Sequence, residues 1–137
     1  MKVAVAVITN AKGQVLITRR PQHATHSGFW EYPGGKLELN ETAEQALIRE
    51  IKEEIALEVE HYHYLGEVNH RYSESQVSLQ VFHVDQIAGE AQCCEGQMDL
   101  RWVEFSALGH YDFPAANEQI IVLIHEKILE SVDTSLA

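Results

Sequence analysis

Residues Trp30 to Leu57 read WEYPGGKLELNETAEQALIREIKEEIAL, and the rest of the 137-residue chain can be interpreted outward from this stretch. An aromatic-proline turn leads through two glycines into a segment with helical spacing. Thr42 and Gln45 have the spacing of a capping box, so we expect a helix to begin there. At about 100° per residue, one face of this helix gathers aliphatic side chains, which predicts its buried side. These side chains are Leu47, Ile48, Ile51 and Ile55.

Three glutamates, Glu50, Glu53 and Glu54, occupy an arc of the helix next to its aliphatic face. Their spacing places like charges together, at a cost of about 0.2–0.5 kcal/mol per pair in an isolated helix. Arg49 and Lys52 are too few to cancel this repulsion. The arc is either a solvated acidic face, which is common for glutamate-rich runs, or a site for a hard divalent cation. Mg²⁺ prefers carboxylate oxygens and also binds substrate phosphates.

The spacing of the fixed residues favours the cation. Gly35, five residues, Glu41, seven residues and then REIKEEIAL resembles the Nudix box, G-x5-E-x7-R-E-U-x-E-E-x-G-U, where U is aliphatic. Every fixed position matches except one, because Ala56 stands where the family has glycine. A helix commonly ends in the left-handed conformation at such a position. Alanine costs about 1 kcal/mol if that conformation is kept; otherwise the helix runs slightly further.

The resemblance implies a role for each matching residue. The implied metal ligands are the backbone carbonyl of Gly34 and the side chains of Glu50, Glu53 and Glu54. Either Glu50 or Glu53 also orients or deprotonates the attacking water, and Arg49 holds a glutamate by ion pairing. Glu95, in a polar loop, is either a further carboxylate of the site or an ordinary exposed residue. The implied cofactor is Mg²⁺, with Mn²⁺ as a substitute.

Four further segments are similar to the MutT branch of the family, whose enzymes hydrolyse oxidised purine nucleoside triphosphates, notably 8-oxo-dGTP, to the monophosphate and pyrophosphate. These segments are Leu16–Arg20, Trp30–Lys36, Glu95–Gln97 and Asp112–Asn117. The similarity implies a small-molecule nucleotide substrate held by Arg20, Tyr32, Lys36 and Asn117. Arg20 would contact phosphate, although an arginine at a strand end is also ordinary surface charge. Tyr32 stands where that branch tends to have phenylalanine.

The chemistry of oxidised guanine sets what its pocket needs. Oxidation at C8 turns N7 from an acceptor into an N–H donor and leaves O6 an acceptor. Asn117 can present its NH₂ group to O6, and we expect a backbone carbonyl of Tyr72–Val77 to face N7. The other interpretation is that Asn117 caps the final helix.

Composition limits the partners of the chain. Ten basic and 21 acidic residues give a formal net charge of −11, which argues against binding a nucleic acid polymer by counterion release. The adjacent Cys93 and Cys94 are expected to be reduced. The sequence has no apolar run long enough to span a membrane. It also shows no signal peptide. We therefore expect a cytoplasmic protein without a membrane partner, and a monomer.

The order of strands and helices predicts one α/β domain over residues 1–137. A hairpin is expected from residues 3–8 and 14–18, followed by a long bulged strand at 59–68, a strand at 77–84, and one at 100–105 with Trp102 buried. A helix over about 118–131 would bury Ile120, Ile121, Leu123, Ile124 and Ile128. Two helices among these strands predict an α/β/α sandwich around a mixed sheet, and the resemblance implies the Nudix fold.

Two alternatives to the 8-oxo-dGTP hydrolase remain at this point. One is a Nudix hydrolase of another nucleoside diphosphate derivative, such as a dinucleotide or a nucleotide sugar. The other is a binding module with the Nudix fold and no catalysis. Such a module is expected to lose glutamates of the box, whereas this chain keeps them all.

Overall fold

The structure is a computed structural model in which residues 1–24 and 26–129 are described. It has a four-stranded sheet in the order β4-β1-β6-β5 and a three-stranded sheet in the order β3-β2-β7. The strands are β1 (Lys2–Ile8), β2 (Gln14–Arg19), β3 (Trp30–Glu31), β4 (Gly34–Lys36), β5 (Glu58–Tyr72), β6 (Ser75–Ala88) and β7 (Asp99–Glu104). The helical segments are α1 (Ala43–Ile55), the 3-10 helix η1 (Phe105–His110), α2 (Ala115–Glu118), α3 (Ile120–Leu123) and the π-helix η2 (Ile124–Leu129).

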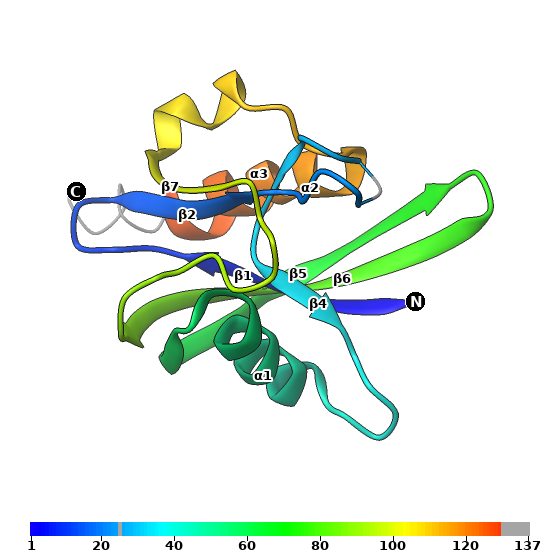
Figure 1. Ribbon diagram of the computed structural model, residues 1–137, viewed down its shortest axis with the longest axis horizontal. Helices are drawn as coiled ribbons and strands as arrows, with labels where there is room; N and C mark the ends of the chain where they lie inside the picture. The colour runs from blue at the N-terminus through cyan, green and yellow to red at the C-terminus, as the bar shows by residue number, and fades with distance from the viewer. Residues whose placement is uncertain (25, 130–137) are drawn as a thin grey trace.

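The four-stranded sheet is the middle layer of the molecule. Its strands are mixed, since β1 is parallel to β6 and antiparallel to β4. Side chains of β1 alternate between two cores, as a strand's geometry requires. Ala4, Ala6 and Ile8 pack with α1, whereas Val5 and Val7 pack with the second sheet and the C-terminal helices. Helix α1 therefore covers one face and the remaining layers cover the other (Figure 1). The predicted α/β/α sandwich around a mixed sheet is confirmed.

The expected hairpin between the first two strands is wrong. β1 and β2 lie in different sheets. An isolated antiparallel bridge between Thr9 and Val15 joins the end of β1 to the start of β2. The reason is that β1 is buried on both faces and already pairs along both edges, with β4 and with β6. β2 pairs instead with β3 and β7.

Helix α1 begins where the sequence predicts. Thr42 is its N-cap, and both hydrogen bonds of the capping box with Gln45 are present. The helix ends at Ala56, whose φ of 62° and ψ of 27° are left-handed, so the family's cap geometry is kept with alanine. Ile48 departs from the prediction, because its side chain lies at the margin of the buried arc and is 38% exposed. Ala46 is buried in its place, with the other three aliphatic residues.

The remaining strands and the C-terminal segment differ from expectation mainly in length and regularity. β5 is longer than predicted and irregular, with register shifts against β6. Trp102 is only partly buried against the α1 core. The predicted final helix is divided among α2, α3 and η2, and its expected end at 131 lies outside the described residues. Its buried residues are Ile120, Ile124 and Ile128, while Ile121 and Leu123 are partly buried. In the described part of the chain, none of the helices has the length and apolar character needed to span a membrane.

Candidate active site

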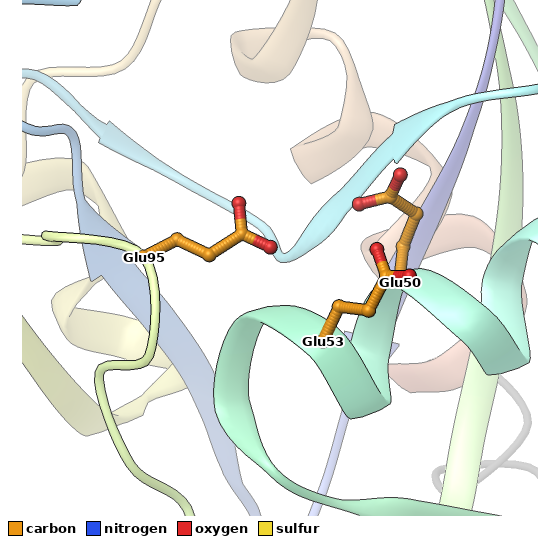
Figure 2. Close-up of side chains that lie close together, drawn as sticks. All are labelled: Glu50, Glu53 and Glu95. Carbon is orange, nitrogen blue, oxygen red and sulfur yellow. The ribbon is translucent and has the colours of Figure 1, made fainter.

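Three carboxylates converge beside α1. One ligand oxygen from each of Glu50, Glu53 and Glu95 lies within 4.8 Å of the others. Glu50 and Glu53 project from successive turns of α1, and Glu95 reaches toward them from the loop between β6 and β7 (Figure 2). The structure thus brings Glu95 to the carboxylates predicted from the box. Clustered carboxylate oxygens are the ligands that hard divalent cations prefer.

The loop that carries Glu95 is fastened to the C-terminal end of α1. The backbone N–H of Cys94 donates to the carbonyl of Glu54 at 2.9 Å, and the side-chain amide of Gln97 donates to the same carbonyl at 3.0 Å. Gln97 also accepts from the N–H of Glu95 at 2.9 Å. Carbonyls at a helix end lack helical partners, so these bonds satisfy the helix and position Glu95 together. Both Cys93 and Cys94 are free and exposed.

Glu54 is more deeply buried than the other glutamates of the triplet. Both Glu50 and Glu54 fall within the buried arc of the helix, whereas the exposed Glu53 lies beside it. Oε2 of Glu54 accepts a hydrogen bond from the N–H of Gly34 at 3.0 Å. Burial is the main reason that the pKa of Glu54 is raised to about 9. In the metal-free protein this carboxyl therefore holds a proton near neutral pH.

Gly34 and the box glycine Gly35 let β4 approach its neighbours closely. A Cβ at Gly34 would lie 2.0 Å from the carbonyl oxygen of Ala4 on β1. A Cβ at Gly35 would lie 2.3 Å from the carboxyl carbon of Glu50. Any larger residue would therefore push β4 off β1 or displace Glu50 from the cluster.

Arg49 holds the acidic residues around it in place. Its guanidinium donates twice to Glu41, at 2.7 and 2.9 Å, and also to Glu50 at 2.8 Å and Glu53 at 3.1 Å. A further bond of 3.1 Å reaches the carbonyl of Lys36. Hydrogen bonding to Arg49 is the main reason that the pKa of Glu41 is lowered to about 2. This geometry suits a residue that orients the carboxylates, because its donors point at them.

A large cavity of about 610 Å³ opens next to β4 and the turn between β5 and β6. Its walls include Arg20, Lys36 and Asn117, three of the four residues predicted to hold substrate, together with Tyr72 and other residues of the 72–77 segment. His26 also lines the cavity, and its ring lies 5.6 Å from that of Tyr72. His26 was not predicted to line the site, because it lies in a loop whose path does not follow from local spacing.

Tyr32, the fourth predicted substrate residue, does not line this cavity. Its side chain is 3% exposed, and its ring stacks on Phe113 at 5.2 Å with an interplanar angle of 9°. Its phenolic oxygen is the one buried side-chain polar atom without a hydrogen bond among the described residues. Its backbone N–H donates to Oδ1 of Asn117 at 3.3 Å. Tyr32 therefore affects the cavity indirectly, because its backbone N–H holds the side chain of Asn117 in position.

Asn117 is not a helix cap. It lies inside α2, whose N-cap is Pro114, so the capping interpretation is wrong. Because its side-chain oxygen faces the N–H of Tyr32, the NH₂ group is the end of the amide that remains for a ligand in the cavity.

A second cavity of about 190 Å³ lies beside the first, and its walls include Glu54, Glu95 and Glu31. Arg20 lines both cavities. Its guanidinium forms an ion pair with Glu31 at 2.5 Å. A ligand that extends from Asn117 to the carboxylates would thus pass the ion pair of Arg20 and Glu31.

Comparisons with known proteins point to one family. Residues 4–123 match the family described as NUDIX domain. The chain is 34% identical over 121 residues to the 8-oxo-dGTP diphosphatase of Escherichia coli (strain K12), covering 88% of this chain and 93% of that protein. It is also 34% identical over 93 residues to the CTP pyrophosphohydrolase of the same strain, covering 68% of this chain and 69% of the relative. A solved structure from a study of MutT from Aliivibrio salmonicida and Vibrio cholerae has a TM-score of 0.78 and 32% identity, covering 92% of this chain and 99% of that one.

Proposed function

This chain belongs to the Nudix domain family, and on that premise we propose that it hydrolyses oxidised purine nucleoside triphosphates, principally 8-oxo-dGTP. The products are the nucleoside monophosphate and pyrophosphate, and the role is to remove oxidised nucleotides from the precursor pool before they cause mutations. The observation that carries the proposal is the position of Arg20. It lines both the cavity that contains Asn117 and the cavity that contains Glu54 and Glu95, as a triphosphate between a base site and a metal site requires.

Nudix hydrolases generally need a divalent metal, and the donor set fits one. The ligands we propose are the carboxylates of Glu50, Glu53, Glu54 and Glu95 with the carbonyl of Gly34. All are oxygen donors, which suits Mg²⁺, with Mn²⁺ as a substitute. When bound, such ions lower the pKa of water and neutralise phosphate charge.

The protein's own groups supply position and proton transfer. Arg20 and Lys36 line the cavity with positive charge, which would hold the phosphates. Water attacks a phosphorus, the bond to the leaving phosphate breaks, and a carboxylate accepts the proton of the water. Glu53 or Glu50 takes this role in our proposal. Arg49 bonds to both, so it would keep the base oriented without touching the substrate.

Base selection follows from two groups acting together, Asn117 and a backbone carbonyl of the 72–77 segment. The NH₂ group of Asn117 would donate to O6 of the purine, and the carbonyl would accept from the N7–H that only the oxidised base carries. Support for this pairing comes from Tyr72 and Asn117 lining one cavity. Unoxidised guanine would place two acceptors opposite each other, at a cost of about 1–3 kcal/mol or more in a closed site.

We extend the proposal to the state of the protein. The chain is proposed to be one domain over residues 1–137 and a cytoplasmic monomer. Its ligand is a small nucleotide, because the net charge of −11 opposes binding of a nucleic acid polymer.

A substrate panel with Mg²⁺ tests the proposal. The panel contains 8-oxo-dGTP, dGTP, CTP, a dinucleotide and a nucleotide sugar, with monophosphate and pyrophosphate both quantified. We expect the highest kcat/KM for 8-oxo-dGTP. The highest value for CTP, or for the dinucleotide or sugar, would assign a different Nudix substrate. Binding without hydrolysis of any member would indicate a non-catalytic module.

A further inference from the structure

We propose a second metal site, separate from the carboxylates, in which His61, His63 and His83 bind a transition-metal ion such as Zn²⁺. Asp85 and Thr9 orient two of these imidazoles. The site lies where β5 begins and β6 ends. Imidazole nitrogen suits Zn²⁺, Ni²⁺ and Cu²⁺ but not Mg²⁺, so the ion would differ from the one proposed for hydrolysis.

Two of the imidazoles are already neighbours. His63 on β5 is directly opposite His83 on the antiparallel strand β6. Their ring centroids are 4.9 Å apart, with the rings at 74°. Side chains at directly opposed positions have their Cβ atoms about 4.5–5.5 Å apart, which allows two imidazoles to share one ion.

A β-bulge brings the third imidazole and its carboxylate together. His61 pairs with Gln86 while Tyr62 pairs with Val84, so Asp85 is the extra residue on β6. Bulges of this kind re-aim side chains. Nδ1 of His61 lies 2.5 Å from Oδ1 of Asp85. With Nδ1–H donating to the carboxylate, Nε2 of His61 is the nitrogen left for an ion.

His83 is oriented in the same way by a hydroxyl group. Its Nε2 lies 2.8 Å from Oγ1 of Thr9, so a proton on Nε2 leaves Nδ1 as the ligand. Metal-binding histidines almost always donate their other N–H to an oxygen in this manner.

The histidines are well separated from the proposed active site. Phe82 and Val84 pack in the core beneath α1, so His83 between them faces the other side of the sheet. Tyr72, in the wall of the large cavity, lies nine positions after His63 on β5, which is roughly 30 Å along a strand. Residues at the turn between β5 and β6 line that cavity, and Figure 1 shows this turn at the far end of the β5–β6 ladder from the start of β5.

The site is not fully assembled without its ion. Across the described residues, the acidic group of Glu50, Glu53 and Glu95 is the one with three ligand atoms within 4.8 Å of one another. His63 and His83 therefore provide the first two ligands, and the exposed side chains of His61 and Asp85 move together to bring Nε2 of His61 to the ion. Solvent exposure of His61 and His63 leaves room for this movement.

Calorimetric titration with Zn²⁺ in excess Mg²⁺ tests the proposal, with imidazole NMR signals as a second readout. We expect the wild type to bind one more Zn²⁺ than His63→Gln or His83→Gln, with shifts in the ring signals of all three histidines. His110→Gln is the matched control, because His110 is exposed in η1. Thr9→Val should weaken binding by about tenfold or more. Since His63 is exposed, its variant keeps the test valid if the His83 variant fails to fold.

Equal Zn²⁺ stoichiometry in the wild type and in His63→Gln would overturn the proposal, as would an equal loss in His110→Gln. Hydrolysis with Mg²⁺ should be unchanged in His63→Gln. A failure of the zinc site and a failure of the proposed hydrolase are therefore distinguishable.

Discussion

The backbone N–H of Gly34 on β4 and the side chain of Glu54 on α1 are joined by a hydrogen bond of 3.0 Å. This bond ties the end of the helix to the strand whose glycines approach β1 and Glu50 closely. Burial is the main cause of the raised pKa of Glu54, and the neighbouring carboxylates raise this pKa further. The hydrogen bond from Gly34 acts in the opposite direction and lowers the pKa. Glu54 is therefore poised to lose its proton when a cation enters.

Metal binding should release a proton from Glu54. Its pKa of about 9 in the folded protein exceeds its ordinary value of 4.5, so the metal-free folded state binds more protons than the unfolded state. The free energy of unfolding should then fall as the pH rises through this window, and Mg²⁺ affinity should rise with pH between about 6 and 8. Calorimetry in buffers of different ionisation enthalpy measures the protons released. Glu54→Gln is the control, and a wild-type affinity independent of pH contradicts the assignment.

Glu53→Gln should lower kcat by a factor of about 10² or more, as expected for loss of a metal ligand or base. Stability should change little. The variant loses a contact of 3.1 Å with Arg49 at an exposed site, worth about 0.3–0.5 kcal/mol, and it relieves repulsion from Glu50 and Glu95. Single-turnover kinetics and a denaturant titration check the two expectations. Full activity in this variant would remove Glu53 from the mechanism.

Ala56→Gly should raise the free energy of unfolding by about 1 kcal/mol. The residue has a left-handed φ of 62°, which glycine adopts without the cost that a Cβ imposes. A thermal melt measures the change, and the rate of hydrolysis should be unaltered. Destabilisation of similar size would mean that the helix continues through this position in solution.

Tyr32→Phe should stabilise the protein by about 1 kcal/mol, because the buried phenolic oxygen is desolvated without a hydrogen bond. The ring would keep its stacking on Phe113. Chemical denaturation of the two proteins gives the difference. The value of kcat/KM for 8-oxo-dGTP should be retained in the variant. A loss of stability of about 1 kcal/mol would instead show that the hydroxyl forms a hydrogen bond with a water or a ligand.

Local sequence predicted the features that local geometry controls. Thr42 and Gln45 fix the start of α1 through bonds within one turn, and the box spacing identified Glu50 and Glu53. The confirmed three-layer architecture likewise follows from the order of apolar segments. Pairing between strands that are distant in sequence does not follow from local spacing, which is why the predicted hairpin at Thr9 was wrong. The apolar residues of β1 indicate that the strand is buried, but they do not indicate which strands pair with its edges.

The burial of individual helix residues and the contacts between distant residues could not be predicted from the sequence pattern either. Glu54 looked like a member of an acidic arc, although its place among buried residues gives it a distinct pKa. The orientation of the Asn117 side chain in α2 depends on its tertiary contact with Tyr32. Arg20 could be matched by resemblance, but only the folded chain places it on the walls of two cavities.

The ratio of kcat/KM for 8-oxo-dGTP to that for dGTP, measured in the wild type and in Asn117→Ala, tests the central claim most directly. We expect a high ratio in the wild type. In the variant, KM for 8-oxo-dGTP should rise steeply while the values for dGTP change little, because the clash of unoxidised N7 with the backbone carbonyl keeps guanine out of the position in which its O6 meets the NH₂ group. A ratio that stays the same in the variant would contradict the selection of oxidised guanine by Asn117.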